Sequence, residues 1–184
     1  MIRKFLAIGF LSLLIFGFIG CGYTTRSLIS DKYKTIYITP FTNKIDITLD
    51  SDAGDKYELY RPHLESEITK AVSNRYLFDG NLKPVRESNA NMIMEGELAQ
   101  FRKDPLRYAD NSDNVLEYRV NIVVNLKMWD NTGPEKQILW EENGFTGETS
   151  YFVTGTQAIS EDQAIQNSII DLARRIVERT VEQW

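Results

Sequence analysis

The segment Tyr118-Arg-Val-Asn-Ile-Val-Val-Asn-Leu-Lys-Met128 carries the most regular pattern in the sequence. Every second side chain is apolar, and the positions between them include Arg119, Asn121, Asn125 and Lys127. An alternation of this kind predicts a long β-strand with one buried face and one face in water.

A second strand is expected directly after it. Residues 131–136 (NTGPEK) are turn formers, and Gln137–Glu148 is rich in strand-forming side chains. Two strands joined by so short a connection predict an antiparallel hairpin. Residues 149–159 are then expected to form a loop, in which Tyr151 and Phe152 are candidates for exposed aromatic side chains.

Three more strand candidates lie upstream. Thr35–Thr39 is β-branched and aromatic, and Asn91–Arg102 alternates apolar and polar residues. Leu82–Arg86 is a weaker candidate because Pro84 cannot donate a hydrogen bond to a neighbouring strand. Residues 103–114 (KDPLRYADNSDN) contain proline, aspartate and asparagine, which predicts a connecting loop.

Two segments have the periodicity of amphipathic helices. The first runs from about Tyr57 to Leu77 and stops at Asp79–Asn81, and the second begins at the capping-box sequence Ser160–Gln163 and continues to Trp184. A helix stripe and a sheet face each need an apolar partner. We therefore expect an α+β fold with two helices packed on one face of a roughly four-stranded mixed or antiparallel sheet.

The N-terminus has the composition of an export signal. A basic start, Met1–Lys4, precedes an apolar run that ends at Gly20 and Cys21. A cysteine directly after the small residue resembles the lipobox of bacterial lipoproteins, which implies acyl chains on Cys21. The alternative is an ordinary signal peptide with an incidental cysteine. Gly22 stands where an aspartate would favour retention in the inner membrane, so the same resemblance favours export to the outer membrane.

These observations divide the chain into three parts. We expect a lipoprotein signal peptide at residues 1–20, a lipidated tether at residues 21–34 and a single α/β domain at residues 35–184.

Composition narrows the function classes. Acidic residues outnumber basic ones by 26 to 21, which argues against non-specific binding of nucleic acid. One cysteine and one histidine, His63, exclude a disulfide framework and a multi-histidine metal centre. The sequence lacks a nucleophile elbow, a phosphate loop and a dinucleotide-binding glycine motif. Glu95 and Glu97 share a strand face, but 26 acidic residues make such a spacing common. We predict a non-enzymatic protein without metal or cofactor.

Several motifs occur in a specific order. They are Cys21–Tyr23 after the lipobox, Ile36–Asn43, Ala90–Leu98, Glu117–Val120 and the C-terminal Glu182–Trp184. Together with the helix that contains Leu64, this set resembles the LptE family of lipopolysaccharide-assembly lipoproteins. The resemblance implies two helices on a four-stranded sheet and a lipid-anchored protein at the outer membrane that faces the periplasm or a barrel lumen. It also implies a partner, the LptD β-barrel, in which the lipoprotein sits as a plug while lipopolysaccharide reaches the outer leaflet.

The same resemblance points to lipopolysaccharide-binding residues. Lipopolysaccharide carries phosphates and acyl chains, so a contact surface needs Lys or Arg near apolar side chains. Arg107 is the best match for a basic family position before the long strand, and Arg102, Lys103 and Arg119 lie close to it in the sequence. A second basic family position has no match, because Trp140–Glu142 is acidic here. The alternative for the four residues is a solvated sheet edge.

A different class of function also fits a lipoprotein of this size. A periplasm-facing lipid-transfer or ABC-transporter-accessory lipoprotein would enclose acyl chains in a cavity of its own. The polar residues on one face of the main strand argue against that alternative.

Overall fold

The computed structural model describes residues 32–45, 61–110 and 113–182. In chain order the elements are β1 (Thr35–Ile38), β2 (Thr42–Asn43), α2 (Leu64–Asp79), β3 (Lys83–Pro84), a 3-10 turn η1 (Glu87–Asn89), β4 (Met92–Tyr108), β5 (Val115–Asp130), β6 (Gln137–Phe152) and α3 (Glu161–Glu182). The expected signal peptide, the lipidated Cys21 and most of the tether lie outside the described residues, as does Trp184.

The strands form one mixed sheet in the order β3-β1-β4-β5-β6, with β2 paired to β4 as well. The strands β4, β5 and β6 form an antiparallel meander, whereas β1 runs parallel to β3 and β4. The predicted hairpin and the mixed sheet are therefore confirmed. The expected count of about four strands is wrong, because the sheet has six. The strand β3 lies within the weak candidate Leu82–Arg86, whereas β2 is two residues long and too short for an alternation to show in the sequence.

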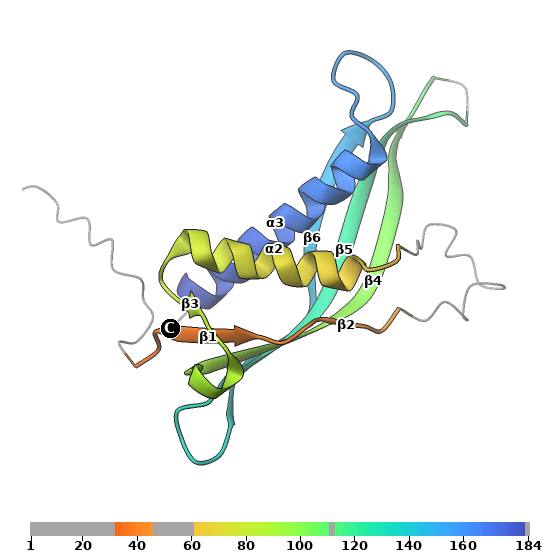
Figure 1. Cartoon of the computed structure of the whole chain (residues 1–184). Coiled ribbons are helices and arrows are strands. Elements are labelled where there is room, and N and C mark those ends of the chain that lie inside the picture. The colour runs from red at the N-terminus through yellow and green to blue at the C-terminus, as the bar shows by residue number, and fades with distance from the viewer. Residues whose placement is uncertain (1–31, 46–60, 111–112, 183–184) are drawn as a thin grey trace, which may run out of the picture.

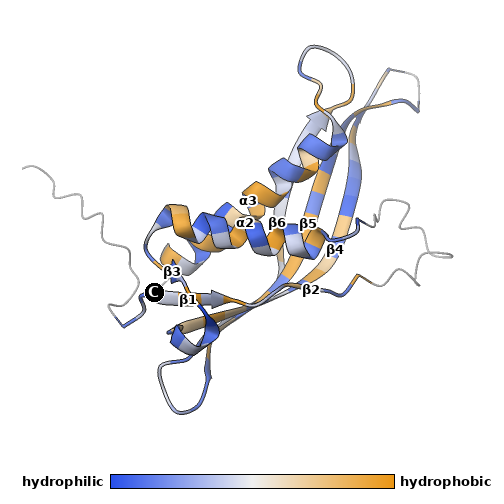
Figure 2. Cartoon of the chain, in the orientation of Figure 1, coloured by the Kyte–Doolittle hydropathy of each residue, from blue (hydrophilic) through white to orange (hydrophobic). Residues whose placement is uncertain are grey.

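The alternation that predicted β5 is real. Its even-numbered side chains from Val120 to Met128 are buried and face the helices, and the odd-numbered ones between them are partly exposed. Figure 2 shows the alternation as apolar and polar bands along the long strands. The polar face expected from Arg119, Asn121, Asn125 and Lys127 is the face that the helices leave uncovered.

The strand β4 is longer than expected. The predicted loop at residues 103–114 is wrong over residues 103–108, because these continue the pairing with β5 as far as Tyr108. Within the described residues, β1 and β2 pair with β4 only up to Leu98. Beyond that point no strand of the described part of the chain lies beside this edge of β4, and a proline is tolerated on such an edge. Pro105 lies opposite Tyr118, next to a shift in register.

The strand β6 is also longer than expected. Residues 149–152 belong to it, so the predicted loop begins too early, and the expectation of an exposed Tyr151 is wrong. The Tyr151 ring is 4% exposed and stacks on Tyr118, its cross-strand partner, with 6.0 Å between ring centroids. Pairing between aromatic residues on neighbouring strands stabilises a sheet, but it depends on a register that the local sequence does not disclose.

Both helices follow their predicted apolar patterns, but α2 begins at Leu64 and not near Tyr57: residues 61–63 are not helical, and residues 57–60 lie outside the described residues. The buried residues of α2 are Leu64, Ile68, Val72 and Tyr76, and the helix stops where Gly80 adopts a φ of 78° and donates its N–H to the Tyr76 carbonyl. A left-handed glycine is the commonest helix stop. At the start of α3 the Gln163 N–H donates to the Ser160 hydroxyl over 3.2 Å, as a capping box requires. Figure 1 shows both helices on the same side of the sheet.

The helix α3 lies directly against β6 and β5. Its apolar stripe is buried, and it consists of Ala164, Ile165, Ile169, Leu172, Ile176 and Val177. The contact is close at Gly147, because a Cβ on that residue would lie 2.4 Å from Leu172 Cβ and 2.7 Å from its Cα. Gly147 faces the helix opposite Ile122, so its missing side chain sets the distance between helix and sheet.

Asp130 joins the start of the described chain to the sheet. Its carboxylate is buried and accepts hydrogen bonds from the Lys32 ammonium, the Tyr33 hydroxyl and both the N–H and the hydroxyl of Thr132. Burial raises the pKa of the Asp130 carboxyl, but these hydrogen bonds outweigh burial and hold its pKa well below its ordinary value.

Adding a side chain at Gly147 should separate α3 from the sheet. We expect Gly147→Ala to lower the free energy of unfolding by about 1–3 kcal/mol, because helix backbone and not a flexible side-chain tip must move. Gly133→Ala is the control, since its Cβ would meet nothing nearer than the Glu135 carbonyl oxygen at 3.6 Å. Urea denaturation measures the free energy of unfolding of both variants. Equal losses of stability in the two would contradict the role given to Gly147.

Removing the Asp130 charge should lower the free energy of unfolding by an amount that depends on pH. A carboxyl whose folded pKa is lowered stabilises the fold above its unfolded pKa, and this stability disappears as the pH falls through the folded pKa. We expect Asp130→Asn to cost about 1–3 kcal/mol at neutral pH. The difference from wild type should shrink below about pH 4, where the unfolded carboxyl protonates.

Urea denaturation across the acidic range tests this expectation. Asp110→Asn, at an exposed position, is the matched control. A deficit for Asp130→Asn that stays constant into strong acid would show that the lost stability does not come from the ionised carboxylate.

Candidate functional site

The four basic residues singled out from the sequence lie at one end of the sheet, but on two faces. Arg102, Arg107 and Arg119 lie on the uncovered face, where Arg102 is opposite Asn121. Lys103 is opposite Val120, whose side chain is buried toward the helices. We call Arg102, Arg107 and Arg119 the arginine cluster, and the end of β4, β5 and β6 that carries it the distal end.

Lys103 lies on the opposite face from the other three because of the strand alternation and two register shifts in β4. Up to Leu98 the even-numbered residues of β4 face the helices, and the register then shifts between Leu98 and Gln100. After this shift the odd-numbered residues face the helices, beginning with the buried Phe101, and a second shift between Pro105 and Arg107 returns Arg107, opposite Glu117, to the uncovered face. Lys103 consequently pairs with Glu161 in the first turn of α3, with 2.7 Å between Nζ and Oε2, and lies over the Tyr118 ring.

Each arginine of the cluster has a carboxylate beside it. The nearest nitrogen–oxygen distances are 3.0 Å for Arg102 and Asp104, 3.5 Å for Arg107 and Glu117, and 3.6 Å for Arg119 and Glu148. Formal charge at the arginine cluster therefore balances. The two longer pairs involve arginine side chains that are 62% and 43% exposed. Exposed pairs of this kind contribute little to stability, so Arg107 and Arg119 can exchange partners with a ligand at low cost.

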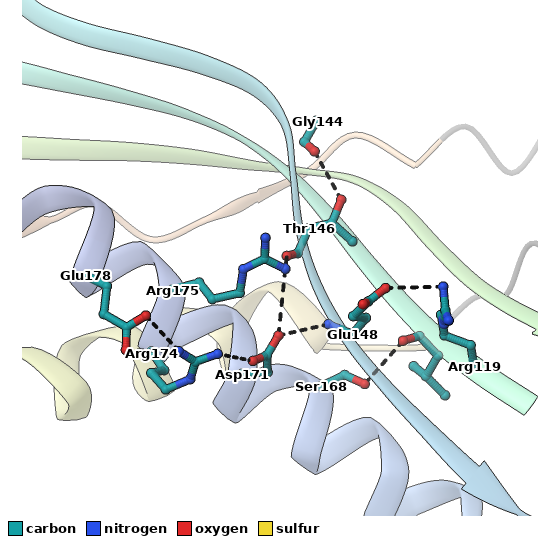
Figure 3. Close-up of polar contacts among 10 residues, drawn as sticks. Arg119, Gly144, Thr146, Glu148, Ser168, Asp171, Arg174, Arg175 and Glu178 are labelled. Carbon is teal, nitrogen blue, oxygen red and sulfur yellow. Dashed lines mark hydrogen bonds and ion pairs between the residues drawn. The ribbon is translucent and has the colours of Figure 1, made fainter. Parts of the chain in front are cut away.

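Arg119 is positioned indirectly by α3. Asp171 on the helix accepts the Glu148 N–H over 3.1 Å, and the Glu148 carboxylate in turn lies beside Arg119. The next helical turn contributes Arg175, which donates to the Thr146 carbonyl. Figure 3 shows these contacts in one view, with Arg174 holding Asp171 from the other side. Side chains of α3 thus satisfy backbone groups on the outer edge of β6.

Apolar side chains surround the arginine cluster. The Arg107 guanidinium lies 5.5 Å from the Phe152 ring centroid. Further exposed apolar residues gather at the distal end and in the segment after β6, namely Leu106, Tyr108, Val153 and Ile159. The distal end therefore combines guanidinium groups with exposed apolar surface, which suits a ligand that carries both anionic groups and hydrocarbon.

The acidic partners of the arginine cluster were not among the residues predicted from the sequence. Glu117 lies two positions before Arg119, so the strand alternation already placed its side chain on the same face. Glu148 could not be found in this way, because its place beside Arg119 depends on the register between β5 and β6. Arg107, which the family resemblance placed in a loop, lies in β4.

The other chemical candidates are weak as sites. Glu95 and Glu97 are both exposed and line a shallow hollow of about 120 Å³ with Lys127 and Glu141, which pair with each other over 3.2 Å. His63 is exposed just before α2, with a φ of 64°. Within residues 32–45, 61–110 and 113–182, no group of three His, Cys, Asp or Glu side chains is placed to hold a metal ion. In the same ranges no helix has the length and apolar character needed to cross a membrane.

The family assignment rests on the sequence model of the lipopolysaccharide-assembly family LptE, which matches residues 33–183. This chain belongs to the LptE family. The family consists of non-enzymatic lipoproteins that are associated with the outer membrane and act in lipopolysaccharide assembly. The match covers every element described above, from β1 to α3. A search of curated proteins found no match.

Two solved structures of low sequence identity have a fold similar to that of this chain. A Xanthomonas campestris protein is 12% identical with a TM-score of 0.52, over 80% of this chain and 84% of that one. A hypothetical protein from Chlamydia trachomatis is 11% identical with a TM-score of 0.50, over 80% of this chain and 95% of that one. Rare lipoprotein B from Shewanella oneidensis is 16% identical with a TM-score of 0.44, over 78% of this chain and 92% of that one.

Proposed function

We propose that this protein is an outer-membrane lipoprotein, anchored by acyl chains on Cys21, that plugs an LptD-type β-barrel and assists the insertion of lipopolysaccharide into the outer leaflet. The observation that carries the proposal is membership of the LptE family over residues 33–183. In this role the protein performs no chemistry and needs no cofactor. It acts by binding and stabilising the barrel and by positioning lipopolysaccharide.

The uncovered face of the sheet suits the inside of a barrel. The interior of outer-membrane barrels is polar. The wet face of the meander presents charged and amide side chains along its whole length, including Glu95, Asn121, Asn125 and Lys127. Each long strand has 16 or 17 residues, so the meander is roughly 50 Å long. A slender, polar-faced element of this length supports a plug that reaches into a lumen.

We further propose that the arginine cluster contacts lipopolysaccharide. Phosphate oxygens are strong acceptors for guanidinium groups, and the loosely paired Arg107 and Arg119 are the available donors. The neighbouring Phe152 and the exposed apolar residues of the distal end offer hydrocarbon contacts. Lys103 takes no part in this proposal, because it points to the other face and holds Glu161.

The lipid-carrier alternative needs an acyl cavity between helices and sheet. That space is filled with fully buried side chains from both layers, among them Tyr76, Phe101, Ile122 and Leu172. The packing therefore favours the plug.

Reversing two charges in the arginine cluster should weaken lipopolysaccharide binding. We expect Arg107→Asp with Arg119→Asp to reduce affinity by roughly tenfold or more in surface plasmon resonance, since two charge-assisted hydrogen bonds are lost. The fold should persist, because both side chains are exposed. Lys44→Asp with Lys70→Asp makes the same charge change at exposed positions outside the distal end. Equal weakening by the two pairs would show that net charge and not the cluster controls binding.

The barrel partnership can be tested without mutation. Affinity purification of the full-length tagged protein from the native outer membrane in mild detergent should recover a large β-barrel protein at near-equal stoichiometry. Recovery of the protein alone, with lipid bound in the domain, would contradict the plug and support the carrier.

A further inference from the structure

The C-terminal end of α2 exposes two consecutive large apolar side chains. Leu77 is 62% exposed and Phe78 is 89% exposed. Their neighbour Tyr76 is fully buried and donates its hydroxyl to Thr180 of α3 over 2.8 Å, and Gly80 ends the helix two residues after Phe78. The helix end is therefore held in place by buried contacts, and Leu77 and Phe78 project from a fixed base.

Apolar surface continues from Phe78 onto α3. A hollow of about 290 Å³ lies beside it, with Ala71, Phe78, Ile170 and Ala173 contributing apolar lining. Ile170 is itself 62% exposed. Scattered single apolar residues are normal on protein surfaces. Here, however, the exposed residues adjoin one another across two helices, and a contiguous apolar patch of this kind marks an interaction site.

The basic residues around this patch differ from those at the distal end. Lys34, Arg75, Lys83 and Arg86 are exposed, and none of them forms an ion pair within the described part of the chain. Lys34 and Lys83 are neighbours, because the Lys83 N–H donates to the Lys34 carbonyl over 2.9 Å. Arg75 precedes Phe78 by three positions and so shares its side of the helix.

The acidic residues of this region leave its positive charge in excess. The Asp79 carboxylate, which accepts a hydrogen bond from the Asn81 side chain, is one negative charge against these four cations, and Glu87 pairs with Lys136. The arginine cluster, by contrast, has a carboxylate for every guanidinium. Within the described residues, positive charge is therefore in excess beside the apolar patch and balanced at the arginine cluster.

The lipid anchor would enter at this same end. Cys21 precedes Lys32 by eleven residues, which span at most about 40 Å when fully extended. Asp130 fixes Lys32 and Tyr33 to the sheet, and β1 begins beside β3. Only three residues separate β3 from the end of α2. Figure 1 shows the start of β1, the end of α2 and β3 gathered at one end of the molecule.

We infer that this end of the domain docks onto the surface of the phospholipid bilayer that holds the Cys21 acyl chains. Phe78 and Leu77 enter the interface, and Lys34, Arg75, Lys83 and Arg86 meet anionic headgroups. A fixed apolar tip flanked by basic residues binds membrane surfaces by apolar burial together with electrostatic attraction. The inference rests on the proposed anchor at Cys21, and it adds a second contact that sets the orientation of the domain.

A fluorescent probe at position 78 tests the inference on the full-length lipoprotein. Acylation occupies Cys21, the single cysteine of the sequence, so Phe78→Cys provides the only free thiol for an environment-sensitive label. In vesicles of phosphatidylethanolamine and phosphatidylglycerol we expect a blue-shifted emission and several-fold weaker quenching by aqueous iodide than in detergent. Leu106→Cys, at the distal end, is the matched control and should remain open to iodide.

The outcomes separate the anchor from the docking surface. Flotation of the protein with the vesicles reports the anchor, so a chain that fails to float overturns both. A chain that floats while its position 78 is quenched as strongly as position 106 overturns the docking surface alone. Protection at position 78 that rises with protein concentration in detergent indicates a second copy as the occupant and also overturns it. Lys83→Glu with Arg86→Glu should restore quenching at position 78 without loss of flotation, whereas Lys44→Glu with Lys70→Glu should not.

Discussion

The packing of α3 along β5 and β6 is the contact on which the rest of the molecule depends. It buries the apolar stripe of the helix and the even-numbered face of β5 in one layer. Its closeness is possible because Gly147 presents no side chain to Leu172. The same contact supports α2 through Tyr76 and Thr180, and it places Asp171 where it can hold the backbone of Glu148. Core packing and the position of Arg119 thus come from one helix–sheet interface.

Much of this architecture is encoded locally. The alternation of β5, the turn at residues 131–136, the glycine stop of α2 and the capping box of α3 each depend on neighbouring residues, and each is confirmed. The misjudged features depend on contacts between distant segments. Among the described residues no strand pairs with the other edge of β4 at Pro105, which suits a proline, and Tyr151 is buried because Tyr118 lies opposite it. Neither fact can be inferred from residue propensities or from the hydrophobic periodicity of the sequence.

The candidate site illustrates the same limit more sharply. Three of the four basic residues chosen from the sequence do share a face, but two register shifts in β4 decide which three: the first, after Leu98, turns Lys103 toward the helices, and the second, after Pro105, returns Arg107 to the uncovered face. One extra residue in a strand inverts the facing of the residues beyond it until the next shift. Carboxylate partners contributed by β6 were equally invisible, because the register between β5 and β6 decides them. The residue types suggested the site, but its net charge depends on which carboxylates the strand register places beside the arginines.

The length of the meander has a mechanical consequence. Strands of 16 or 17 residues run between the end that holds Lys32 and the arginine cluster. At roughly 3.3 Å per residue they form a lever arm of about 50 Å, so a rocking of about 10° at its base moves the tip by roughly 9 Å. Small changes in how the base is seated are therefore amplified into displacements the size of a sugar ring or a phosphate at the far end. In a molecule of this shape, the orientation of the base therefore determines how far the distal end extends.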